Sequence, residues 1–236
     1  MTEWKARRFW KEVTVAPCDG GWQVLLDGRP ILTPGKQPLR LPSHPLAEAV
    51  AAEWDAQGEV IAPLSMPLTR AANSAIEKVA PQFDAVADML ASYGATDLLC
   101  YRATAPAELV QAQAQAWDPL IDWAQDRYGI ELTVTQGVMP VTQPAPTLAA
   151  LRARLDPLTP FQLTGLHDLV TLPGSLILGL AVYEGRLDAG QAHGLARVDE
   201  DYQASVWGAD TEAASAAAGR LQAMRDAERL LQLLRD

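Results

Sequence analysis

The hydrophobic pattern of this chain changes near residue 43 from a period of two to a helical period. Between residues 8 and 41, apolar and polar residues alternate, and Asp27-Gly28 separates two apolar runs. An Asp-Gly pair between such runs is a strong signal for a two-residue hairpin, because both positions must adopt positive φ. The N-terminal stretch therefore predicts a small antiparallel β unit.

A helix is predicted near residues 43–57, with Ser43 as its N-cap, Pro45 in its first turn and Gly58 as its end. Almost everything after residue 69 has helical spacing. The predicted helices span 69–79, 83–92, 106–128, 147–155, 160–169, 175–184, 189–206 and 210–236. The stretch "GIELTVTQGV", residues 129–138, is the one later strand candidate. Gly179 is expected to permit close helix packing.

These patterns predict an α+β protein with a small β-rich N-terminal domain and a larger all-helical C-terminal domain. We place the first domain at residues 1–62, including the helix near 43–57, and the second at residues 63–236. With 236 residues, 49% of them hydrophobic, the chain can bury a sizeable core. It should therefore fold without disulfides or a structural metal.

Composition excludes several classes of partner. The net charge is −10, and the only basic cluster is Lys5, Arg7, Arg8 and Lys11, which disfavours binding to nucleic acid. No apolar run approaches the roughly 20 residues of a membrane span, and the N-terminus lacks the apolar core of a signal peptide. The two cysteines, Cys18 and Cys100, lie far apart, which favours a reducing, intracellular location.

Motifs for catalysis or cofactor binding are missing from the sequence. It contains no GxxxxGKS/T loop and no GxGxxG after a strand. His44, His167 and His193 have no metal-ligand spacing, and Ser175 does not lie in a GxSxG turn. We therefore expect no cofactor, no metal and no enzyme activity. One alternative stays open, a small hydrolase that uses Asp199 or Glu200 with His167 in an interdomain cleft.

Three consecutive acids, Asp199, Glu200 and Asp201, resemble paired catalytic carboxylates when they are read as a line. On one helix, however, neighbouring side chains point about 100° apart. Helical spacing instead places Asp199 at the margin of the packing face, where it needs a hydrogen-bond partner. Asp201 is four residues from Arg197 and is expected to form a solvated ion pair with it.

Glu200 shares its helical face with Ala196, Gln203, Ala204 and Trp207. Two interpretations of this face remain open. It is either a solvated glutamate beside a tryptophan that belongs to the core, or a strip that recognises another protein through an acid and an aromatic anchor.

Eight motifs, in order over nearly the whole chain, resemble the ATP-twelve family of assembly chaperones, which attend the alpha subunit of the F-type ATP synthase. They are "RRFWKEVTV", "VLLDGRPILTP", "LPSHPLAEAVAAEWDAQ", "MPLTRAANSAIE", "YGATDLLCYRA", "QAQAWDPLIDW", "GSLILGLAV" and "RVDEDYQASVWGAD". The resemblance implies the same two-part fold. It also implies an ATP-independent, non-enzymatic chaperone that binds the unassembled alpha subunit and prevents its aggregation before the hexamer forms.

The resemblance further implies which residues matter. The acid of the "DEDYQ" motif is associated with chaperone function, and we assign it to Glu200, with Asp199, Gln203 and Trp207 as further partner-binding candidates. The other motifs give a structural signature of Trp54, Asp27, Gly28, Asp97, Trp117 and Asp118. A bacterial, cytoplasmic protein that is monomeric when free is expected, with relatives in the mitochondrial matrix of eukaryotes.

Overall fold

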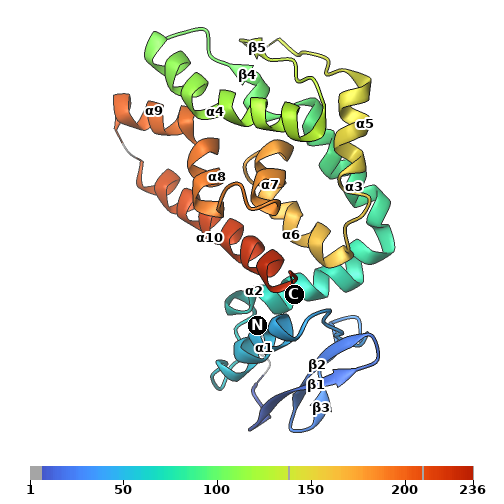
Figure 1. The fold of residues 1–236 in the computed structure, drawn as a ribbon. Coiled ribbons are helices and arrows are strands. Elements are labelled where there is room, and N and C mark those ends of the chain that lie inside the picture. Colours follow the sequence, from blue (N-terminus) through green and yellow to red (C-terminus); the bar gives the residue numbers. More distant parts are fainter. Residues whose placement is uncertain (1–6, 138, 209, 236) are drawn as a thin grey trace. The chain divides into compact units, whose positions relative to one another are not determined.

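The computed structural model describes residues 7–137, 139–208 and 210–235, so Lys5 of the basic N-terminal cluster and Val138 of the later strand candidate lie outside it. The chain divides into two compact units. In the described part, unit 1 holds residues 7–83, 160–164 and 229–235, and unit 2 holds the remainder. Figure 1 shows the small sheet followed by a helical remainder.

The N-terminal strands form a three-stranded antiparallel sheet in the order β1-β2-β3: β1 Val13–Cys18, β2 Gly21–Leu26 and β3 Arg29–Pro30. Asp27 and Gly28 connect β2 to β3 with φ values of 47° and 78°, which confirms the predicted hairpin. The Asp27 carboxylate accepts hydrogen bonds from the backbone N–H groups of Lys11 and Glu12 at 3.0 and 2.9 Å. A second two-residue hairpin, between β1 and β2, was not predicted.

The first helix, α1, spans His44–Asp55, and the side chain of Ser43 caps it by accepting a hydrogen bond from Leu46 N–H, as predicted. The helix ends before Gly58. Near its C-terminus, the Glu53 carboxylate accepts hydrogen bonds from the N–H groups of Leu68 and Thr69 at 2.7 and 2.8 Å. These are N-terminal donors of α2, Pro67–Ser74, which would otherwise be unpaired, so Glu53 fixes α2 against α1.

The core of unit 1 lies between the sheet and α1. It is built from buried apolar side chains of the segment before β1, of β2, of the residues between β3 and α1, of α1 and α2, and of the C-terminal end of the chain: Trp10, Val24, Leu26, Ile31, Leu39, Leu41, Leu46, Ala47, Val50, Leu68, Ala72 and Leu230. Trp54, half-buried, packs its ring 5.2 Å from the ring of Trp10 at the edge of this core. Trp54 therefore contributes packing rather than surface.

Helices make up most of the rest of the chain. They are α3 Phe83–Ser92, α4 Ala107–Tyr128, α5 Ala145–Ala153, α6 Pro160–Thr171, α7 Leu176–Tyr183, α8 Ala189–Ala196, α9 Val198–Trp207 and α10 Thr211–Leu233. Short 3₁₀ helices are η1 Pro63–Ser65, η3 Ala80–Gln82, η4 Tyr93–Ala95 and η5 Leu98–Cys100, and η2 Ala75–Val79 is a π-helix that continues α2. The later strand candidate forms only β5, Thr135–Gln136, parallel to β4, Tyr101–Arg102.

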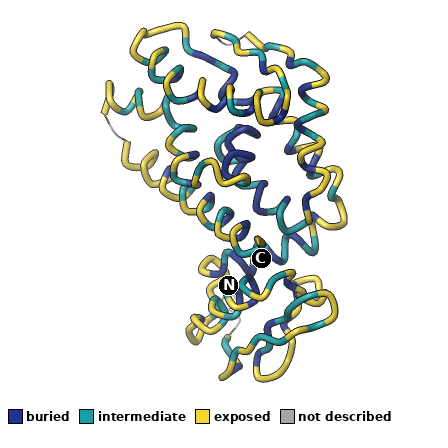
Figure 2. Tube along the Cα trace, viewed as in Figure 1, coloured by how far each residue is buried: buried dark blue, intermediate teal, exposed yellow. Residues whose placement is uncertain are grey.

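Helix α7 is the centre of unit 2. Every residue from Leu176 to Val182 is buried, and α7 packs against α4 and α8 (Figure 2). A helix that is apolar on all sides must be enclosed by other elements. Gly179 lets α6 approach, because a Cβ atom there would lie 2.4 Å from Val170 Cγ2, which confirms the predicted close contact.

The helix predicted over residues 189–206 is wrong in one respect, because it is two helices. The backbone at Arg197, with φ −108° and ψ 12°, leaves the helical region and separates α8 from α9. Gly194, a poor helix former, lies in the last turn of α8. The break gives the acids of the "DEDYQ" motif a helix N-terminus of their own.

The predicted α+β class is confirmed. The two compact units are defined by contacts between residues, and unit 1 includes segments from the end of the chain. The domain boundary between residues 62 and 63 therefore stays a prediction. Among the described residues, no helix combines the length and the apolar character needed to cross a bilayer.

Replacing Gly179 by alanine should lower the free energy of unfolding by about 1–3 kcal/mol, because the new methyl group has no room beside Val170. Gly219→Ala is the matched control. Gly219 lies within α10, and a Cβ atom added there would meet no other atom within 4 Å, so alanine should gain up to about 1 kcal/mol. Denaturant unfolding measures both, and equal effects would contradict the close packing of α6 and α7.

Candidate functional site

Helix α9 is held in place by a polar contact with α4. The buried side chain of Gln113 accepts a hydrogen bond from Ala103 N–H at 2.7 Å and donates one to Asp199 Oδ1 at 2.6 Å. Asp199 is half-buried, as predicted for a carboxylate at the margin of the packing face. Just before α9, Trp117 Nε1 donates to the carbonyl oxygen of Leu195 at 2.8 Å.

The outer surface of α9 is open to solvent. None of its residues is buried. Glu200 and Gln203 are exposed, and the exposed fractions of Val206 and Trp207 are 54% and 86%. Trp207 is therefore not part of the core, so the interpretation that placed it there is wrong. What remains is an acid and a large aromatic ring on one exposed helix.

The three acids also have a local structural role. Asp199, Glu200 and Asp201 all lie in the first turn of α9, where no side chain caps the helix. Negative charge at a helix N-terminus is stabilising, because it faces unpaired N–H groups. The predicted ion pair is present as well, with Arg197 Nη2 and Asp201 Oδ1 2.8 Å apart. Asp199 and Asp201 thus have partners within the protein.

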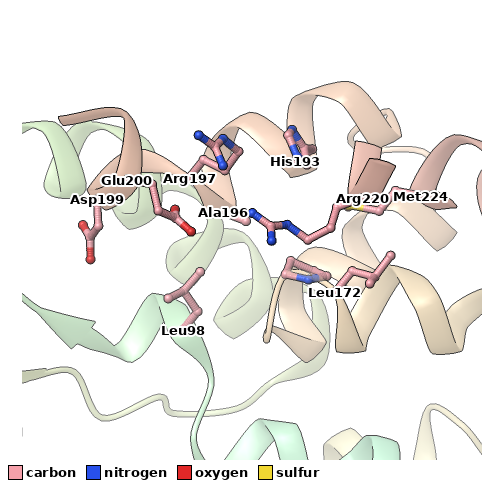
Figure 3. Close-up of a pocket in the computed structure, with 10 residues that line it drawn as sticks. Leu98, Leu172, His193, Ala196, Arg197, Asp199, Glu200, Arg220 and Met224 are labelled. Atoms are coloured by element: carbon pink, nitrogen blue, oxygen red, sulfur yellow. The ribbon is translucent and has the colours of Figure 1, made fainter. Parts of the chain in front are cut away.

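A pocket with a volume of about 360 Å³ lies beside the N-terminus of α9 (Figure 3). Its lining combines apolar and charged side chains from η5, α6, α8, α9 and α10: Leu98, Leu172, Pro173, His193, Ala196, Arg197, Asp199, Glu200, Arg220 and Met224. The predicted neighbours Ala196 and Glu200 therefore share a concave surface. Gln203 and Trp207 do not line the pocket and lie further along α9.

His193 is the titratable base of the pocket. Burial, followed by the positive charges of Arg197 and Arg220, lowers the pKa of its imidazole, while a hydrogen bond with the Ala217 backbone opposes them. The imidazole is therefore neutral at pH 7. Its Nε2 atom is buried and has no hydrogen-bond partner within the described part of the chain.

The residues of the hydrolase alternative do not come together. Ser175, set aside as a nucleophile on sequence grounds, is buried, caps α7 and donates a hydrogen bond to Asp97 Oδ1 at 2.7 Å. His167 Nδ1 lies 2.8 Å from its neighbour Asp168, and His167 is not among the residues lining the pocket beside Glu200. A search of the described residues finds no cluster of three His, Cys, Asp or Glu side chains placed for a metal ion.

Comparison with protein-family models places residues 7–125 in the family described as ATP12 chaperone protein, which is half of the chain. The structure of Atp12 from Paracoccus denitrificans is 64% identical, with a TM-score of 0.96 over 99% of this chain and 100% of that one. This chain belongs to the ATP12 chaperone family.

Other relatives agree. An aspartate-to-lysine mutant of Paracoccus denitrificans Atp12p is 63% identical, with a TM-score of 0.96 over 99% of this chain and 100% of that one. A protein from Agrobacterium tumefaciens is 44% identical, with a TM-score of 0.93 over 97% of this chain and 86% of that one. The mitochondrial protein atp12 of Schizosaccharomyces pombe is 26% identical over 214 residues, 86% of this chain and 74% of that protein.

Residues of unit 2 that belong to the motifs shared with the ATP12 family form polar contacts with buried partners, and Asp97 and Trp117 are themselves buried whereas Asp118 is exposed. Arg102, almost fully buried, forms an ion pair with Asp118 at 2.7 Å, and its guanidinium lies 5.3 Å from the ring of Trp117. Asp97 accepts hydrogen bonds from Ser175 Oγ and from Ile177 N–H at 2.7 and 3.0 Å, which ties η5 to α7. These residues therefore hold the elements of unit 2 in place.

Sequence patterns missed the contribution of α8 and α10 to the pocket. Arg220 and Met224 are four residues apart, which indicates a shared helix face. Nothing in the sequence shows that this face lies opposite Glu200. From the sequence, His193 could be judged only as a possible metal ligand, by its spacing from other histidines. The structure shows that it lines the pocket, with a lowered imidazole pKa.

The buried Asp97 makes stability depend on pH. Burial raises the pKa of its carboxyl from 3.8 to about 6, against the hydrogen bonds from Ile177, Ser175 and Leu99. Because the folded pKa lies above the unfolded one, the stabilising contribution is complete below pH 3.8 and is lost as the pH rises through 6. Over the whole titration, a pKa shift of this size corresponds to a change of roughly 3 kcal/mol in the free energy of unfolding.

The substitution Asp97→Asn removes this titration. The difference in unfolding free energy, wild type minus variant, should therefore fall by roughly 2 kcal/mol between pH 4 and pH 7, because the carboxyl of the unfolded chain is already partly ionised at pH 4. Urea unfolding of both proteins at several pH values in this range measures the difference, and the contributions of all other acids cancel. A difference that does not change with pH would contradict a protonated Asp97 in the folded state.

Proposed function

We propose that this chain is an ATP-independent assembly chaperone that binds the unassembled alpha subunit of the F-type ATP synthase catalytic sector. By covering that subunit it prevents aggregation before the hexamer forms. The observation that carries the proposal is helix α9, which has no buried residue and presents Glu200 and Trp207 to solvent, in a member of the ATP12 chaperone family.

The chemistry of α9 suits a reversible protein partner. An unassembled subunit exposes apolar surface that its neighbours will later cover, and such surface aggregates. Trp207, 86% exposed, offers a large apolar contact, while Glu200 offers a charge that fixes orientation. A small mixed surface of this kind binds specifically without forming a permanent interface.

In this proposal, the residues of α9 have different roles. Asp199 is already bonded to Gln113 and positions the helix. Glu200, Gln203 and Trp207 contact the client, and Trp54 supports the fold of unit 1. Because the sequence has no phosphate-binding loop, release comes from displacement by the beta subunit rather than from ATP hydrolysis. The protein acts as a monomer in the bacterial cytoplasm, and its eukaryotic relatives act in the mitochondrial matrix.

The variant Glu200→Lys should stay folded and lose its ability to keep the alpha subunit soluble, because it reverses the charge of an exposed side chain that has no internal ion pair within the described part of the chain. Co-expression with the alpha subunit, followed by measurement of its soluble fraction, tests this. A pull-down against separately expressed alpha and beta subunits should retain alpha alone.

Glu131→Lys is the matched control, since it makes the same charge change at another exposed position of unit 2. It should protect the alpha subunit as the wild type does. Both variants should stay folded, and Glu200→Lys should lower the free energy of unfolding by only about 1 kcal/mol, because it loses a favourable charge in the first turn of α9. Full protection of alpha by Glu200→Lys would show that Glu200 is not in the binding surface. Retention of beta instead of alpha would refute the proposed client.

A further inference from the structure

The pocket beside α9 contains two opposite charges without a partner in the part of the chain that the structure describes. Within the described residues, neither Glu200 nor Arg220 makes a hydrogen bond or an ion pair, whereas Asp199 is bonded to Gln113 and Arg197 to Asp201. Figure 3 shows the carboxylate of Glu200 and the guanidinium of Arg220 directed toward each other from α9 and α10. Both charges are available to a ligand.

The space around these charges is partly apolar. Leu98, Leu172 and Met224 line the pocket together with Glu200 and Arg220. The volume of about 360 Å³ lies at the small end of the range for ligand pockets, and it can admit one or two side chains but no folded element. Methylene groups of a long side chain can pack on such a surface while its charged end meets a carboxylate.

We propose that this pocket receives a segment of the client polypeptide that carries one basic and one acidic side chain. The basic group binds Glu200, the acidic group binds Arg220, and the aliphatic part of the basic side chain lies on Leu98, Leu172 and Met224. This inference rests on the proposed function and specifies which kind of client segment the site selects.

Continuity with the α9 surface favours a polypeptide occupant. Glu200 belongs both to the pocket and to the exposed helix that ends in Trp207, so one bound segment can enter the pocket and cover the ring. The opposite charges add selectivity. A segment with only basic groups would leave Arg220 facing a like charge, and a purely acidic segment would leave Glu200 facing one.

The test is a double-mutant cycle on the full-length chain with purified alpha subunit as the probe. Glu200→Gln and Arg220→Gln should each weaken the affinity roughly tenfold or more, because each removes a charge-assisted hydrogen bond to a different client group. The double variant should bind more weakly than either single variant, and the deviation of its loss from the product of the two factors measures the coupling between the two side chains. Each single variant should also reduce the dependence of affinity on salt.

Arg225→Gln and Glu131→Gln are the controls. Arg225 lies on α10 outside the pocket, and Glu131 is exposed elsewhere in unit 2, so both variants should bind alpha like the wild type. Unchanged or tighter binding by Arg220→Gln would overturn the inference, because Arg220 would then make no contact with the client. Wild-type protein that fails to bind alpha would instead overturn the proposed function.

Discussion

The hydrogen bond between Gln113 and Asp199 is the contact on which the candidate site depends. A helix normally keeps its place by burying an apolar stripe, but α9 has no buried residue. Its position comes from Gln113, which is itself fixed by the backbone N–H of Ala103, and from the neighbouring bond between Trp117 and the Leu195 carbonyl. Val206 and Trp207, at the far end of α9, stay exposed and are available to another protein.

The three acids of the "DEDYQ" motif differ in their contacts within the protein. Asp199 bonds to α4, Asp201 bonds to Arg197, and Glu200 alone remains without an internal partner among the described residues. The same holds for two cations of the pocket: Arg197 is paired with Asp201, and Arg220 has no ion pair with any residue that the structure describes. An unpaired charge on a solvated surface has little cost in the free protein and gains a partner on binding.

Local signals in the sequence predicted local structure well. Asp27-Gly28, the Ser43 cap and the close contact at Gly179 each follow from backbone conformation or side-chain size within a few residues. The break at Arg197 was missed because the apolar spacing continues through it. The pocket was missed because Arg220 and Glu200 come to line one pocket only through the packing of α10 in unit 2, and sequence periodicity contains no information on which helices pack together.

The central claim is that α9 is the surface that holds the client. Amide hydrogen exchange of the full-length chain, alone and saturated with purified alpha subunit, tests it directly. In the free protein the amides of residues 198–207 should exchange readily, because their helix lacks buried contacts. Binding should slow them more than any other helix of unit 2. A saturated complex in which these amides exchange at the free rate, while another surface is protected, would contradict the account.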